Sequence, residues 1–163
     1  MKRSLTKKFE ELRLYWKNYV LQSIFATLVI FAVLSVLGLQ QAVIIASIGA
    51  TAFIVFAMPN SAAAKSVNII GGQLVGFACG YLCAQITTPD ASLLVLAMVY
   101  SLAVGSSMFI MVVTDTEHPP ASGTALGVAI SGFSPKVLIA LIASVIALSL
   151  VHHFFKRYLK DLT

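Results

Sequence analysis

The sequence predicts an all-α membrane protein, a bundle of six transmembrane helices in which the fifth is short and broken. Apolar residues make up 59% of the 163 residues and charged residues only 10%, whereas a soluble domain carries about 25% charged residues. The mean hydropathy is +0.94. The apolar residues also fall into long runs, separated by short polar or proline-containing segments. Such a chain has too few charges to cover a surface that faces water, so we expect a single integral membrane domain.

Basic residues gather at the two ends of the chain and supply most of the net charge of +5. Residues 1–19 are expected to form a basic amphipathic helix at the membrane surface, with Trp16 and Tyr19 as interfacial anchors. Residues 156–163 form a basic tail after the transmembrane domain at 20–155. The positive-inside rule accounts for these charges and places both ends in the cytoplasm. We therefore expect no nucleic-acid partner, and the bilayer itself is the expected partner of both ends.

The first span is expected at 20–39, which as a helix extends ~30 Å, the thickness of the hydrocarbon core. An uncharged turn, Gly38-Leu39-Gln40-Gln41, follows it. Four further long apolar runs cover residues 42–58, 62–87, 92–113 and 136–155.

One apolar run, 121–133, extends only ~20 Å as a helix and is short for a membrane crossing. It is either a half-helix preceded by unwound chain at depth, or a re-entrant segment. With six spans, only Lys136 of the eleven basic residues lies outside, whereas five spans would place Lys156, Arg157 and Lys160 outside. The loop charges therefore favour six crossings.

The six spans divide into two threes, which predicts an inverted repeat of the kind found in many transporters. Segments 48–55 and 121–128 are both rich in small residues, and each contains a Thr-Ala pair followed by a large apolar residue. Thr51 and Thr124 are the threonines of the two pairs.

Small residues repeat every four positions along the third and fifth apolar runs, which lets helices approach closely. The stripes are Gly72, Gly76 and Gly80 in the third run, and Gly123, Gly127 and Ser131 in the fifth. Packing is the preferred role for Gly76, Gly80, Gly127 and Ser131, whereas Gly71 and Gly72 suit either packing or a substrate path. Cys79 and Cys83 are interpreted as small packing residues rather than metal ligands.

The polar segment 114–120 interrupts the apolar sequence, and polar groups at membrane depth persist mainly where they line a cavity or a pathway. If Pro119 or Pro120 begins the fifth helix, the N–H groups of the next three residues point into the break and form an anion site. The hydroxyls of Ser122 and Thr124 add donors. Residues 59–61 before the third span suggest a related arrangement, with Lys65 supplying a full positive charge.

His118 lies in this segment, and histidine titrates near neutral pH, so it is expected either to donate to an anion or to carry a proton with it. Asp115 and Glu117 would repel an anion. We interpret these two carboxylates as caps, as partners of His118, or as a cytoplasmic vestibule. An interfacial capping role for His118 is the alternative.

Residues 117–126, with the sequence Glu-His-Pro-Pro-Ala-Ser-Gly-Thr-Ala-Leu, resemble the signature of the HPP family of integral membrane proteins. A second block, 59–61 with 68–73, is similar as well, and the resemblance extends from about residue 20 to residue 155. It implies a small membrane transporter of a bacterial inner membrane, a thylakoid or a plastid envelope, with relatives associated with nitrite movement. Gln73 departs from the histidine expected in many relatives, which puts a shared protonation role there in doubt.

Three function classes remain open. The first is a carrier or channel for a small inorganic anion, nitrite before others. The second is a membrane-embedded enzyme using Asp115, Glu117 and His118, and the third is a scaffold whose glycine stripes serve only assembly. Against an enzyme, no metal-ligand spacing and no nucleophile with an evident base occur. We expect a transporter that is not an enzyme, needs no cofactor or metal, and forms a homo-oligomer.

The residues expected to bind the anion lie in the two blocks and in the first member of the repeat. His118 and Glu117 are also the residues expected to couple a proton. The binding residues are Thr51, Asn60, Ser61, Lys65, Asn68, Gly71, Gly72, Gln73, His118, Pro119, Pro120, Ala121, Ser122, Gly123 and Thr124.

Overall fold

The computed structural model describes residues 5–37, 42–88 and 90–163, and these residues form six α-helices and no strand. The α-helices are α1 (Leu5–Leu37), α2 (Ala42–Ala57), α3 (Ser66–Ala84), α4 (Leu93–Val113), α5 (Pro120–Ser131) and α6 (Pro135–Phe155). Two short 3-10 helices, η2 (Ala62–Ala64) and η3 (Lys156–Tyr158), precede α3 and follow α6. The predicted all-α bundle with a short fifth helix is confirmed. The predicted turn at 38–41 lies outside the described residues.

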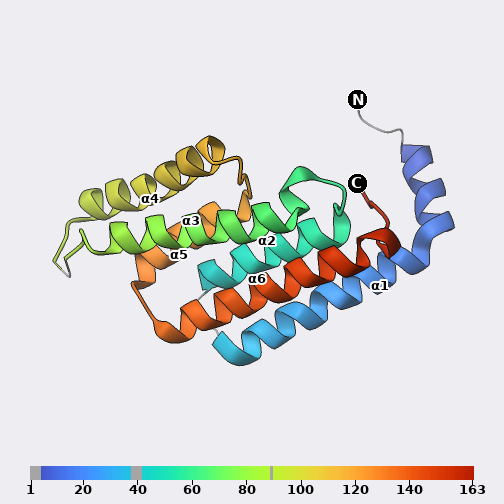
Figure 1. Ribbon diagram of the computed structural model, residues 1–163, viewed down its shortest axis with the longest axis horizontal. Coiled ribbons are helices and arrows are strands. Elements are labelled where there is room, and N and C mark those ends of the chain that lie inside the picture. The colour runs from blue at the N-terminus through green and yellow to red at the C-terminus, as the bar shows by residue number, and fades with distance from the viewer. Residues whose placement is uncertain (1–4, 38–41, 89) are drawn as a thin grey trace.

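The six helices run alternately in opposite directions along the long axis of the molecule (Figure 1). The beginning of α1 and the end of α6 therefore lie at the same end of the bundle. Four helices of the described chain are long and apolar enough to cross a membrane, and α2 is a shorter apolar helix. At 12 residues, α5 extends only ~18 Å.

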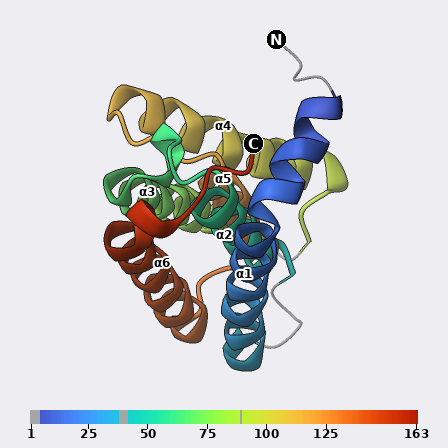
Figure 2. The ribbon, with the colours of Figure 1, turned by 90° about the vertical axis from the view of Figure 1, so that its right-hand side faces the viewer.

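α1 bends at Tyr15, whose φ of −114° and ψ of 21° are not helical. The basic segment before the bend turns away from the axis of the bundle, while the apolar remainder packs along α2 and α6 (Figure 2). The bend shows that the direction of the helix changes near the predicted boundary. That residues 1–19 lie on the membrane surface and the rest of α1 spans it remains a prediction.

α5 lies in the middle of the bundle, packed against α2, α3 and α4 (Figure 2). Seven of its residues are buried, which is a large share for so short a helix. Pro120 occupies its first turn, where the missing proline N–H leaves no helical bond unmade. The connection from α4 to α5 meets the bundle part-way along its length (Figure 1), so the start of α5 is held inside the protein.

Glycines on α3 set the distance between α3 and α5. A Cβ on Gly76 would overlap the carbonyl oxygen of Ala121 and lie 3.0 Å from the carbonyl carbon. A Cβ on Gly80 would overlap the carbonyl oxygen of Ala125, and one on Gly127 would lie 2.6 Å from Ile44 Cγ1. The packing role expected for these three glycines is therefore seen in the structure.

Large apolar side chains cover the outside of the bundle. On α4, Leu93 is 83% exposed and Phe109 70% exposed. The interior in contrast contains buried hydroxyl, amide and imidazole groups beside its apolar core. This distribution is that of a protein surrounded by lipid, in which interior polar groups are costly and are tolerated where they find partners.

Candidate functional site

The connection between α4 and α5, residues 114–119, is held against α3 by one hydrogen bond and by close packing on two glycines. Asn68 on α3 donates from Nδ2 to the carbonyl oxygen of Glu117 at 3.1 Å. A Cβ on Gly71 would lie 2.8 Å from Thr116 Cγ2, and one on Gly72 would lie 2.6 Å from His118 Cβ. The two glycines of α3 therefore let the connection lie directly on the helix, and this contact places His118 in the interior.

His118 is fully buried, and both ring nitrogens have partners. Nδ1 lies 2.8 Å from the carbonyl oxygen of Ala63 in η2. A carbonyl only accepts, so Nδ1 carries a hydrogen. Nε2 lies 2.9 Å from the hydroxyl of Thr51 on α2. A proton taken up by His118 would therefore go to Nε2, which faces Thr51.

A network of buried polar side chains continues from Thr51 between α2, α3 and α5. Gln73 donates from Nε2 to Thr51 Oγ1 at 3.1 Å and accepts at Oε1 from the Thr124 hydroxyl at 2.6 Å. Ser47 Oγ lies 2.7 Å from Thr124 Oγ1 and donates to the carbonyl oxygen of Pro120 at 2.5 Å. None of these side chains is more than 5% exposed. We call the side chains of Ser47, Thr51, Gln73, His118 and Thr124 the central network.

The Thr51 hydroxyl can serve either protonation state of His118. When Nε2 is unprotonated it accepts a hydrogen bond, and the Thr51 hydroxyl donates to it. When Nε2 is protonated it donates to Thr51 Oγ1, and the hydroxyl hydrogen can turn to the carbonyl oxygen of Ser47, 3.1 Å away. No polar group of the network loses its partner in either state, so the remaining cost of protonating His118 is that of burying its positive charge without a counter-charge.

The central network holds no fixed charge. Among the described residues, the buried polar side chains are those of Gln, Ser, Thr, Asn and His, and no Asp, Glu, Lys or Arg is buried. A lone ion entering such an interior would carry a large desolvation cost. The cost of bringing in an anion would be lower if His118 were protonated at the same time, because the anion and the imidazolium together would be neutral.

The structure brings some of the predicted binding residues together and leaves others outside. Thr51, Gln73, His118 and Thr124 belong to the central network, and Pro120 contributes its carbonyl oxygen to it. Asn68, Gly71 and Gly72 hold the connection that carries His118. The residues that lie outside the network are Asn60, Ser61, Lys65, Pro119, Ala121, Ser122 and Gly123.

Lys65 and Asn60 are exposed, so no full positive charge reaches the central network from Lys65. Ser61 Oγ is buried, and in the described part of the chain it has no hydrogen-bond partner. Ser122 points to α4, where Ser107 Oγ lies 3.5 Å from its hydroxyl.

The expectation of three free amides at the start of α5 is wrong for two of them. The N–H of Ala121 donates to the carbonyl oxygen of His118 at 2.8 Å, and that of Ser122 donates to Pro119 at 3.2 Å. The tight turn through the two prolines supplies these acceptors. A preformed anion site made from the first amides of α5 is therefore not present, and the donors near the break are the side chains of the central network.

Glu117 is not a partner of His118, contrary to one of the interpretations offered for it. Its carboxylate is exposed, as is that of Asp115, while the ring of His118 is occupied by Thr51 and Ala63. Asp115 takes a positive φ of 54°, a conformation that Asp tolerates better than most residues, and it turns the chain out of α4.

Sequence reasoning missed Ser47 and the carbonyl oxygen of Ala63. Ser47 precedes Thr51 by one helical turn, so the two share a face of α2, and this spacing could have indicated Ser47. The role of Ala63 depends on the 3-10 turn before α3, and no side-chain pattern marks a backbone acceptor.

Comparison with known proteins gives one family. The model of the HPP transmembrane region matches residues 11–161, which includes all six helices in large part. No curated protein and no solved structure matches the chain. The match covers both blocks that carry the resemblance seen in the sequence, and it is the basis for assigning the chain to a family. This protein belongs to the HPP family of integral membrane proteins.

Proposed function

We propose that the protein transports a small inorganic anion, nitrite before others, and that His118 takes up a proton as the anion enters the central network. The observation that carries this proposal is the pair of hydrogen bonds on His118. One nitrogen is fixed on Ala63, and the other faces a hydroxyl that can serve both protonation states. A solely structural histidine would need only one of these states.

An uncharged interior makes proton and anion binding depend on each other. The amide of Gln73 and the hydroxyls of Ser47 and Thr124 donate within the network in this conformation. They would turn these hydrogen bonds to an entering anion, and protonated His118 would supply the compensating charge. Nitrite is small and its oxygens accept hydrogen bonds, so it suits a site made from such donors. The preference for nitrite rests on the family resemblance, whereas the preference for an anion rests on these donors.

The central network is closed to both sides of the membrane in this conformation, since none of its side chains is more than 5% exposed. Transport therefore requires part of the bundle to move. α5 is the segment we expect to move, because it is short and carries the Thr124 hydroxyl and the Pro120 carbonyl of the site. A carrier with an occluded state fits this arrangement better than an open channel.

An enzyme that uses Asp115, Glu117 and His118 fits the structure poorly, because both carboxylates are exposed and His118 is fully buried. The three groups do not converge on one reacting atom, which general acid–base catalysis requires. We therefore propose that the protein is not an enzyme. A scaffold role explains the glycine contacts but gives the central network no purpose.

The test is nitrite uptake by proteoliposomes that contain the purified protein, measured against chloride and with or without an inward proton gradient. We expect saturable nitrite uptake that rises with the gradient. Protein-free liposomes give the background, because protonated nitrite itself crosses bilayers. His118→Gln should remove the response of uptake to the gradient. His152→Gln is its matched control, since His152 is also buried and lies 2.8 Å from the carbonyl oxygen of Pro59. Anion flux equal to that of protein-free liposomes would overturn the proposal.

A further inference from the structure

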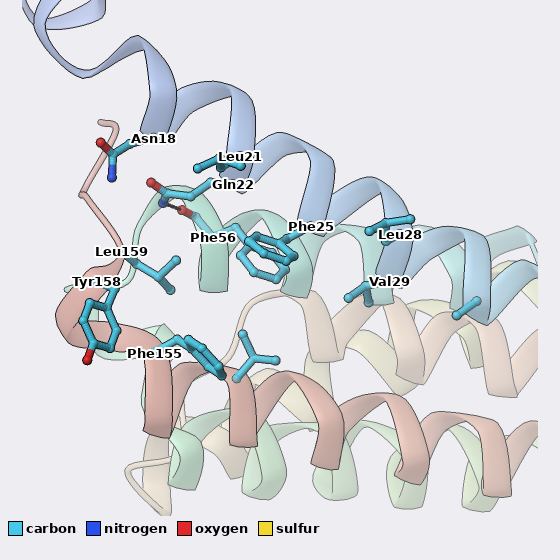
Figure 3. Close-up of a pocket in the computed structure, with 12 residues that line it drawn as sticks. Asn18, Leu21, Gln22, Phe25, Leu28, Val29, Phe56, Phe155, Tyr158 and Leu159 are labelled. Atoms are coloured by element: carbon cyan, nitrogen blue, oxygen red, sulfur yellow. Dashed lines mark hydrogen bonds between the residues drawn. The ribbon is translucent and has the colours of Figure 1, made fainter.

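A groove on the outside of the bundle lies between α1 and α6 and is closed at its base by Phe56 of α2 (Figure 3). Its volume is about 450 Å³. The walls are apolar side chains of the two helices, among them Leu21, Phe25, Leu28, Val151 and Phe155. No residue of the central network lines it, so this groove is separate from the proposed transport site.

The groove changes from polar to apolar along its length. Asn18, Gln22 and Tyr158 lie at the end where α6 stops, while Leu28 and Val29 lie further along α1 (Figure 3). Gln22 holds the chain after η3 in place, because its amide donates to the carbonyl oxygen of Lys160 at 3.0 Å and also to that of Phe56. A molecule that filled this groove would need a polar end and a long apolar end.

Basic residues adjoin the lining residues of the polar end in the chain. The guanidinium of Arg157 lies 4.6 Å from the centre of the Tyr158 ring, and Lys160 Nζ lies 4.3 Å from that of Tyr15. Lys17 precedes the lining residue Asn18 and lies 5.9 Å from the ring of Trp16. Of these three rings only that of Tyr158 lines the groove, while Tyr15 and Trp16 precede the lining residue Asn18 on α1. Cation–π contacts hold the three positive groups at these rings. Aromatic and basic residues together are typical of the level at which lipid headgroups lie.

We propose that the groove binds an anionic phospholipid. One acyl chain lies along Leu28, Phe25 and Phe155, and the phosphate lies beside Arg157 and Lys160. The apolar length accounts for the chain, and the positive rim accounts for a negative headgroup rather than a zwitterionic one. Phe25, Leu28 and Phe155 are each about half exposed, so the groove opens sideways to the bilayer, from which a lipid can enter.

The test is native mass spectrometry of the detergent-purified full chain, titrated with a phosphatidylglycerol or with a phosphatidylcholine that has the same acyl chains. We expect tighter binding of phosphatidylglycerol. Lys160→Gln should weaken it roughly fivefold, since a basic residue near anionic lipid contributes about 1 kcal/mol. Lys136→Gln is the control, because it removes the same charge at the beginning of α6, away from the groove.

A second pair of variants tests the apolar part. Ala32→Trp places a large side chain in the groove, which Ala32 lines, and should abolish the binding of one lipid. Ala97→Trp adds the same side chain to an exposed position on α4 and should not. Equal affinity for the two lipids, or equal effects within either pair, would overturn the proposal. A third outcome would also overturn the proposal. If the protein is a dimer, and Ala32→Trp makes it a monomer that still binds the same lipid, then a second copy of the chain fills the groove.

Discussion

Replacement of Gly76 by alanine should separate α3 from α5. The new Cβ would overlap the carbonyl oxygen of Ala121 and lie 3.0 Å from its carbon, and backbone atoms of a buried helix have no rotamer by which to move away. Overpacking of this kind costs about 1–3 kcal/mol. Alanine also favours helix over glycine by about 1 kcal/mol, so the measured loss in one variant would be smaller than the packing cost.

Comparison with Gly105→Ala separates the packing cost from the gain in helix propensity. Gly105 lies in the middle of α4, and nothing lies within 4 Å of a Cβ placed there. The gain in helix propensity is common to both variants, so the difference in unfolding free energy between them measures the packing cost alone. We expect Gly76→Ala to be less stable than Gly105→Ala by about 1–3 kcal/mol.

The assay is equilibrium unfolding in mixed micelles with increasing SDS, followed by circular dichroism. A lower midpoint for Gly76→Ala than for Gly105→Ala is the expected result. Equal midpoints would refute the reasoning, because α3 and α5 would then not meet at backbone contact. Gly76→Ala should also disturb the central network. Gln73 on α3 reaches Thr124 on α5 at 2.6 Å, and this distance requires the two helices to be this close.

Three further predictions concern single positions. Thr51→Val removes the hydroxyl that serves both states of His118, so uptake in proteoliposomes should lose its dependence on a proton gradient, whereas Thr51→Ser should keep it; equal behaviour of the two would argue against the relay. Gln22→Leu removes the hydrogen bonds between Gln22 and the backbone of Lys160, each worth about 1 kcal/mol. Trypsin should therefore cleave after Lys160 at least about tenfold faster, and an unchanged rate would show that Gln22 does not hold this segment. Gly132 has a φ of 73° and a ψ of −172°, a region nearly confined to glycine, so Gly132→Ala should lower stability in SDS by about 1–3 kcal/mol, although no atom lies within 4 Å of the new Cβ; stability like that of Gly105→Ala would contradict this.

The helices could be predicted well because membrane solvation leaves few alternatives. The runs at 42–58, 92–113 and 136–155 correspond closely to α2, α4 and α6, since uninterrupted apolar sequence in lipid must satisfy its backbone as helix. The short run after the two prolines became the short α5 for the same reason. The third run lost its first residues to η2, because Pro59 and the polar residues after it allow a turn that hydropathy alone does not reveal.

The site could be predicted only in part. His118, Gln73, Thr51 and Thr124 were expected among the anion-binding residues, and the structure joins them in one hydrogen-bonded network. Lys65 was expected there as well, but Lys65 is the N-cap residue of α3 and its side chain is exposed. A long charged side chain at a helix end reaches outward to water or headgroups at much lower cost than it enters an apolar interior.

The packing of α5 and the chemistry of the network depend on one another. Glycines in α3 bring the connection and α5 within reach of Gln73 and Thr51, and the hydrogen bonds so formed satisfy groups that would be costly to bury alone. The inverted repeat predicted from segments 48–55 and 121–128 remains a prediction. Its two threonines nevertheless bind the two ends of one amide, since Thr51 accepts from Gln73 Nε2 and Thr124 donates to Gln73 Oε1.

The most direct test of the central claim is the ratio of nitrite uptake with and without an inward proton gradient, measured for the wild-type protein, His118→Gln and His152→Gln. Uptake by protein-free liposomes is subtracted from each value. The account predicts a ratio well above one for the wild type and for His152→Gln, and a ratio near one for His118→Gln. A His118→Gln protein that keeps the full response to the gradient would contradict the claim that His118 carries the proton.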